Sequence, residues 1–157
     1  MKLSIGQAAP AFSLPDQDGV VHTLADSRGK WTLLYFYPKD ATPGCTIEAQ
    51  TIRDSWAEFT GSNTVVYGIS ADSVASHKKF AEKQGLPFTL LADENKEMVN
   101  AYGVWGKKKM MGKEYDGIFR TSFLVAPDGT IAKIYENVKP SEHAAEVLRD
   151  VKEYAKD

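Results

Sequence analysis

Hydrophobic residues occur in short runs separated by glycine, proline and polar clusters, a pattern typical of alternating strands and helices. Three runs are apolar on both faces, at positions 31–37, 64–69 and 86–91. Runs of this kind favour strands buried in the middle of a sheet. The first of these strands is expected to end at Pro38, because proline has no N–H to donate to a sheet ladder.

Apolar residues at roughly helical spacing follow each predicted core strand and recur near the end of the chain. They predict helices within residues 45–61, 72–85, 93–102 and 140–151. The second helix has Asp72 or Ser73 as a cap and glycine at its end. The positions expected to face the core are, in chain order, Ile47, Ile52, Trp56, Phe59, Val74, His77, Phe80, Ala81, Met98, Val99, Tyr102, Ala145, Val147, Leu148 and Val151.

Two further pairs of short segments are each joined by a tight turn, which predicts β-hairpins. Residues 10–15 and 20–24 flank an acidic turn that ends in glycine. Residues 119–125 and 130–135 flank a Pro-Asp-Gly turn.

Residues 103–117 are expected to form the longest irregular segment of the chain. The segment is punctuated by glycines and carries lysines at positions 107, 108, 109 and 113. A connection of this length is more often functional or mobile than a simple link.

The predicted order is hairpin, strand, helix, strand, helix, strand, helix, hairpin, helix. This order indicates an α/β fold, a three-layer sandwich with a central mixed β-sheet, helices on both faces and an N-terminal β-hairpin. The strand–helix–strand part should be parallel, and the second hairpin should close the sheet with antiparallel strands. No repeat or linker is evident, so residues 1–157 are expected to form a single domain.

Composition narrows the function classes. Of the 157 residues, 43% are hydrophobic and 25% are charged, which is typical of soluble globular proteins. A formal net charge of -2 gives no electrostatic reason to expect nucleic acid or an anionic membrane as a partner. No segment approaches the ~18 apolar residues of a membrane-spanning helix. One cysteine permits no internal disulfide, and residues 1–7 lack a signal-peptide core, so a cytoplasmic location is expected.

The single cysteine lies where the first core strand gives way to a helix. Thr42 stands at a plausible N-cap, Pro43 falls in the first turn, and Cys45 follows. A helix N-terminus offers unpaired N–H groups and the positive end of the macrodipole, both of which stabilise a thiolate. Cys45 is therefore the candidate nucleophile, against the alternative of an inert buried residue.

The spacing P-x-x-x-T-x-x-C formed by Pro38, Thr42 and Cys45, followed by Glu48, resembles the active-site signature of the peroxiredoxins. Within that family the chain is similar to the subgroup called bacterioferritin comigratory protein, or peroxiredoxin Q. The resemblance covers essentially the whole chain and implies a thioredoxin-like fold and a thiol peroxidase that needs no cofactor. Further matching stretches are residues 6–10, 36–48, 102–106 and 120–125.

The resemblance implies a catalytic role for five residues. Cys45 would be the peroxidatic nucleophile, and the Thr42 hydroxyl would hydrogen-bond both peroxide and thiolate. Arg120 would hold the thiolate and polarise the peroxide. Pro38 would shield the site from water, and Glu48 would orient the arginine.

Two more residues are expected to bind substrate: Gly44 through its backbone N–H, and Tyr37 at the edge of the pocket. Simpler readings remain open for three of the others. Thr42 could serve only as a helix cap, Glu48 could only complement the helix dipole, and Arg120 could be a surface residue.

The sequence departs from much of the family because it lacks a resolving cysteine. Relatives that have one carry it at positions matching Gln50 and Ala81. The sulfenic acid formed at Cys45 would then need an external thiol, from thioredoxin, glutaredoxin or glutathione, or a second subunit's Cys45. The lysines of residues 103–117 could dock an acidic reductant, although a solvated segment is the simpler reading. A monomer is expected from the resemblance.

Two other functions compete. A monothiol, thioredoxin-like disulfide oxidoreductase would lack the C-x-x-C motif, because Thr42 occupies the first cysteine's place. A binding module with a redox-sensing thiol is the third class. His22, His77 and His143 have no companion at metal-ligand spacing, so they are read as structural and no metal site is expected.

Overall fold

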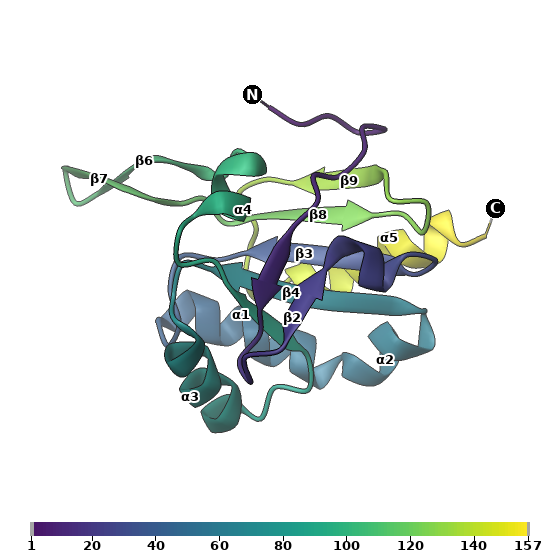
Figure 1. Cartoon of the computed structure of the whole chain (residues 1–157), viewed down its shortest axis with the longest axis horizontal. Coiled ribbons are helices and arrows are strands. Elements are labelled where there is room, and N and C mark those ends of the chain that lie inside the picture. The colour runs from purple at the N-terminus through teal and green to yellow at the C-terminus, as the bar shows by residue number, and fades with distance from the viewer. Residues whose placement is uncertain (1, 157) are drawn as a thin grey trace.

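The computed structural model describes residues 2–156 and contains a five-stranded sheet, two separate β-hairpins, and helices on both faces of the sheet (Figure 1). The strands are β1 (Ser13–Pro15), β2 (Val21–Thr23), β3 (Trp31–Phe36), β4 (Thr64–Ser70), β5 (Thr89–Ala92), β6 (Trp105–Met110), β7 (Lys113–Ile118), β8 (Thr121–Val125) and β9 (Ile131–Tyr135). The helices are the 3-10 helix η1 (Leu24–Ser27) and the α-helices α1 (Pro43–Asp54), α2 (Trp56–Gly61), α3 (Val74–Gln84), α4 (Glu97–Ala101) and α5 (His143–Tyr154).

The central sheet has the strand order β5-β4-β3-β8-β9. Strands β3, β4 and β5 pair in parallel, whereas β8 pairs antiparallel with both β3 and β9. Strand β3 lies in the middle, and its residues after Trp31 are all buried, as expected of a strand with apolar residues on both faces. The predicted mixed sheet, parallel in its first part and closed by an antiparallel hairpin, is confirmed.

The two faces of the sheet carry separate hydrophobic cores. Helices α1, α2, α3 and α5 pack on one face, together with the side chains of Leu33 and Tyr35 from β3. The other face, which includes Leu34 and Phe36, is covered by α4, η1 and the β1–β2 hairpin, which crosses in front of the sheet in Figure 1. The three-layer arrangement with helices on both faces and an N-terminal hairpin is therefore confirmed.

The chain between β3 and α1 forms the turn that the sequence indicates at Pro38. Strand β3 ends at Phe36, and α1 begins at Pro43 with Thr42 in the N-cap position. The Thr42 hydroxyl does not cap the helix, because it donates a hydrogen bond to the Lys39 carbonyl at 2.8 Å. The expected position of the cap is confirmed, but the expected capping hydrogen bond is wrong.

Two expectations about element boundaries are also wrong. The predicted helix of residues 45–61 is divided into α1 and α2 at Ser55, whose N–H is shared among the carbonyls of the preceding turn. Residues 103–117 are not irregular, because β6 and β7 pair antiparallel from Trp105–Ile118 at the base to Met110–Lys113 at the tip. Met111 and Gly112 join them with φ values of 53° and 81°, the two-residue turn that suits a twisted hairpin. The pattern was missed because most of these residues are exposed and show no apolar alternation.

No helix within residues 2–156 combines the length and the apolar character that crossing a bilayer requires.

Gly68 in β4 is expected to be required for packing, because a Cβ at this position would lie 2.7 Å from the Tyr35 hydroxyl and 2.9 Å from Leu90 Cδ2. Gly68→Ala should lower the free energy of unfolding by about 1–3 kcal/mol, since a buried clash forces neighbours off their rotamers. Gly61→Ala is the matched control, because nothing lies within 4 Å of its Cβ position at the end of α2. It should be neutral or stabilising by up to about 1 kcal/mol. The free energy of unfolding of both variants is measured by urea unfolding. If the two substitutions changed it equally, the packing around Gly68 described here would be contradicted.

Candidate active site

Cys45 is the third residue of α1 and lies almost fully buried against the sheet. Its exposed fraction is 2%, and it belongs to the same core cluster as Tyr35 and Tyr37 of the β3 segment. It is a free thiol and the only cysteine of the chain. Its place in the first turn puts the sulfur next to helix N–H groups that have no partner within the helix.

Arg120 reaches Cys45 because of the sheet topology. Strand β8 pairs with β3 so that Thr121 lies opposite Phe36, and Arg120, just before β8, therefore stands beside the end of β3. Its Nη2 donates a hydrogen bond to Cys45 Sγ at 3.4 Å. Its Nη1 donates a second hydrogen bond, at 2.7 Å, to Glu48 Oε1. One guanidinium thus connects the sulfur to a carboxylate.

Glu48 lies one turn after Cys45 on α1, and its side chain is fully buried. Burial raises the pKa of Glu48 to about 7, although the charge of Arg120 and its hydrogen bond oppose the rise. The second oxygen, Oε2, has no hydrogen-bond partner among residues 2–156, which adds to the cost of an ionised carboxyl. Burial alone would lower the pKa of Arg120, but the charges of Glu48 and Cys45 outweigh it and raise that pKa. The arginine therefore stays charged, with 18% of its side chain exposed.

Gly44 and Thr42 line the same turn. A Cβ at Gly44 would lie 3.1 Å from Arg120 Nη2, so glycine allows the guanidinium to approach the start of α1. The Thr42 hydroxyl donates its hydrogen to the Lys39 carbonyl, which leaves its oxygen free to accept one. The structure thus brings Cys45, Arg120, Glu48 and Gly44 together, with Thr42 at the head of the helix.

Pro38 and Tyr37 lie at the end of the core strand. Pro38 is half-buried, and Tyr37 is buried with its ring stacked on Tyr35 at 5.5 Å between centroids. The Tyr37 hydroxyl donates its hydrogen to Asp40 Oδ1 at 2.6 Å, so this hydrogen is not available to the Cys45 sulfur. The shielding role of Pro38 and the substrate contact of Tyr37 stay predictions.

Lys108 of the β6–β7 hairpin, which the sequence placed only among lysines that could dock a reductant, also reaches the site. Lys108 Nζ donates to the Ile118 carbonyl at 2.9 Å, two residues before Arg120. Burial and the charge of Arg120 lower the pKa of Lys108, and the Cys45 sulfur opposes this shift. A hairpin in place of an irregular segment is what brings this lysine to the site.

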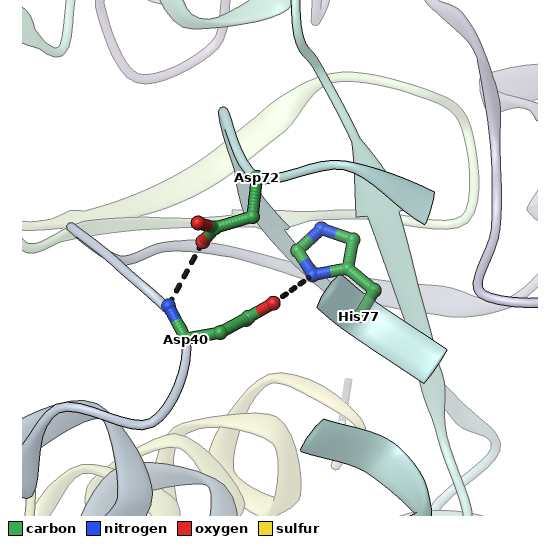
Figure 2. A group of neighbouring side chains, drawn as sticks. All are labelled: Asp40, Asp72 and His77. Carbon is green, nitrogen blue, oxygen red and sulfur yellow. Dashed lines mark hydrogen bonds and ion pairs between the residues drawn. The ribbon is translucent and has the colours of Figure 1, made fainter. Parts of the chain in front are cut away.

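A second polar cluster is made of Asp40 and Asp72, which lie in loops, and His77 of α3 (Figure 2). The three residues offer donor atoms within 4.8 Å of one another, which is a spacing compatible with a metal ion. His77 Nδ1 lies 2.7 Å from Asp40 Oδ2, and Asp72 Oδ2 accepts the Asp40 N–H at 2.8 Å. Because these contacts occupy the donor atoms, hydrogen bonding accounts for the cluster without a metal ion.

The other two histidines also contact carboxylates. His22 lies 2.7 Å from Asp16, and His143 lies 3.1 Å from Glu146. Burial lowers the pKa of His143, and Glu146 opposes that shift. Within residues 2–156 neither residue is hydrogen-bonded to Cys45 or Arg120, and the structural reading of both stays a prediction.

The arrangement around Cys45 is suited to nucleophilic attack by sulfur. The helix N-terminus and the guanidinium both stabilise negative charge on Sγ. The same guanidinium and the backbone N–H groups of the first turn are fixed donors for a leaving oxygen. No second thiol is present to capture the product within one chain.

Comparison with known proteins relates the chain to the peroxiredoxins. A model of the AhpC/TSA family matches residues 5–134. The chain is 48% identical over 153 residues to peroxiredoxin Bcp of Escherichia coli, and the match covers 98% of each chain. It is 45% identical over 153 residues to peroxiredoxin Bcp of Bacillus subtilis, again with 98% of each chain covered.

Solved structures show the same relationship. A mutant of Xylella fastidiosa PrxQ superposes with a TM-score of 0.93 at 34% identity, over 99% of each chain. Xanthomonas campestris bacterioferritin comigratory protein superposes with a TM-score of 0.89 at 36% identity, over 97% of this chain and 99% of that one. The expected thioredoxin-like fold is thereby confirmed. The chain therefore belongs to the AhpC/TSA family, as a peroxiredoxin of the Bcp and PrxQ type that has no resolving cysteine.

Proposed function

We propose that this protein is a thiol-dependent peroxidase that reduces hydrogen peroxide and organic hydroperoxides through a sulfenic acid on Cys45. The observation that carries the proposal is the contact of Cys45 Sγ with Arg120, which is itself held by Glu48. Family membership supports the reaction class, and the geometry supports the assignment of these residues.

In the first step, the Cys45 thiolate attacks one oxygen of the peroxide. An S–O bond forms, the O–O bond breaks, and the electron pair moves onto the leaving oxygen, which takes up a proton to become water or an alcohol. Arg120 and the N–H groups of Gly44 and Cys45 stabilise the charge that develops on that oxygen. The Thr42 oxygen, free to accept, orients the O–H of the peroxide.

In the second step, an external thiol reduces the sulfenic acid. Its sulfur bonds to Cys45 Sγ and releases water, and a second thiol then displaces Cys45 from the mixed disulfide. The chain has no other cysteine, so neither thiol comes from within it. Thioredoxin, glutaredoxin and glutathione are the reductants we propose, in a monomeric, single-domain enzyme of the cytoplasm that needs no cofactor.

The competing functions explain less of the site. A disulfide oxidoreductase of thioredoxin type uses two cysteines in sequence, and Thr42 stands where the first would be. A redox-sensing binding module would not need a buried carboxylate to hold an arginine against its thiol, an arrangement that costs desolvation energy.

Cys45→Ser should abolish peroxide consumption supported by dithiothreitol, because a hydroxyl at this position is not ionised and cannot form a sulfenic acid. Peroxide remaining in solution is the measurement, and mass spectrometry should find one added oxygen on Cys45 of the wild-type protein. The same preparations are assayed for reduction of insulin disulfides. Peroxide turnover by Cys45→Ser, or wild-type insulin reduction that outpaces peroxide reduction, would refute the assignment.

The raised pKa of Glu48 gives a pH-dependent stability. The folded protein holds this proton up to about pH 7, whereas the unfolded chain releases it at the ordinary value of 4.5. The folded state binds more protons between these values, so the favourable contribution is complete below the unfolded pKa and is lost as pH rises through the folded one. The free energy of unfolding of the wild type, minus that of Glu48→Gln, should therefore fall from about pH 5 to about pH 7 and then level off.

Urea unfolding of both proteins across this range tests the point. Glu48→Gln is the suitable reference because it keeps the size of the side chain and an acceptor for Arg120 while removing the titration. A difference that stays constant with pH, or one that rises with it, would show that Glu48 has no raised pKa.

A further inference from the structure

The loop between β3 and α1, which leads to Cys45, is fixed by the side chain of Asp40. Oδ1 accepts the Tyr37 hydroxyl at 2.6 Å, and Oδ2 accepts the Ser76 hydroxyl at 2.8 Å and contacts His77 Nδ1 at 2.7 Å. The backbone N–H of the same residue donates to Asp72 Oδ2 at 2.8 Å. Asp40 thus joins the end of β3 to the end of β4 and to α3, as Figure 2 shows for two of these contacts.

The contact between His77 and Asp40 is a buried hydrogen bond. His77 Nε2 lies 2.9 Å from the Leu91 carbonyl, which can only accept, so Nε2 carries a hydrogen. Nδ1 faces a carboxylate oxygen at 2.7 Å, and two acceptors at that distance would repel each other without a hydrogen between them. Each ring nitrogen is therefore joined to an oxygen through a hydrogen. The side chains are 0% and 4% exposed, and burial of Asp40 is outweighed by His77, which lowers the pKa of the carboxyl.

The residue that follows Asp40 is strained. Ala41 has a φ of 63°, in the left-handed region that a non-glycine residue rarely adopts. Such a conformation persists only where the surrounding structure determines it. Asp40 fixes the chain on one side of Ala41, and on the other side the Thr42 hydroxyl closes the loop onto the Lys39 carbonyl.

We propose that Asp40 and His77 are positioning residues for the peroxide reaction, because together they hold Ala41 in its left-handed conformation and so aim Thr42 and the first turn of α1 at the substrate. The inference rests on the proposed function. Without this contact, Ala41 relaxes toward ordinary φ values, and the Thr42 oxygen and the N–H donors of Gly44 and Cys45 rotate out of alignment. An error of about 1 Å in such a group costs about a hundredfold in rate.

The test separates the two nitrogens of His77 with a matched pair of variants. In His77→Asn, the amide nitrogen takes the place of Nδ1 and still donates to Asp40. In His77→Gln, it takes the place of Nε2 and donates to the Leu91 carbonyl, so Asp40 loses its donor. The readout is the second-order rate constant for oxidation of reduced protein by hydrogen peroxide in stopped flow, with melting temperatures measured alongside. His77→Gln should lose at least about tenfold and His77→Asn at most about threefold.

Two controls complete the design. His22→Asn breaks a histidine–aspartate contact of the same 2.7 Å length in the β1–β2 hairpin, because that contact is made by Nε2 and the asparagine amide takes the place of Nδ1; its rate constant should equal that of the wild type. If His77→Gln does not fold, Ser76→Ala removes one hydrogen bond to the same Asp40 oxygen and should slow the reaction by about twofold to fivefold.

Each outcome decides the proposal. Folded His77→Gln or Ser76→Ala protein with the wild-type rate constant overturns it, and so do His77→Asn and His77→Gln that lose rate equally, since that indicates general packing. A wild-type protein that itself reacts no faster than free thiol would instead refute the proposed function, which keeps the two failures apart.

Discussion

The contact between Arg120 and the Cys45 sulfur, held by a fully buried Glu48, is the interaction on which the rest of the site depends. A carboxylate inside a protein is costly unless a cation accompanies it, and removing one partner of such a pair leaves the other uncompensated. The strand order of the central sheet supplies that cation, because β8 lies beside β3 and delivers Arg120 to the point where the chain leaves β3 for α1. The fold and the chemistry are therefore linked by one pairing of strands.

The loop between β3 and α1 gives the site its precision. Proline ends the strand, Ala41 takes up a left-handed conformation, and Gly44 leaves room for the guanidinium at the start of the helix. The conformation of this loop depends on contacts with other parts of the protein. Asp40 provides them, through Asp72 at the end of β4 and His77 of α3. The sulfur and Asp40 thus come from one short segment at the junction of β3 and α1, whereas the partners of Asp40 come from the end of β4 and from α3.

Features with a clear local pattern could be predicted from the sequence, whereas a hairpin without that pattern and contacts that form only through the fold were missed. The buried strands, the α3 cap at Ser73 and the mixed sheet were visible as apolar runs and turn residues. The position of Cys45 at a helix start was indicated by Pro38 and Pro43. The β6–β7 hairpin was missed because its turn uses Met111 where asparagine or aspartate is usual, and its exposed strands lack alternation. His77 was read as having no companion, because Asp40 and Asp72 approach it only through the fold.

Direct measurement of the peroxide reaction tests the central interaction. Reduced wild-type protein, Arg120→Lys and free glutathione are mixed with hydrogen peroxide at neutral pH in stopped flow, and their second-order rate constants are compared. Lysine keeps the charge but cannot contact the sulfur and Glu48 at once, as the planar guanidinium does. The wild-type rate constant should exceed that of glutathione by at least about a hundredfold, and Arg120→Lys should lose at least about tenfold. A wild-type protein no faster than glutathione, or a variant equal to the wild type, would contradict the role given to this contact.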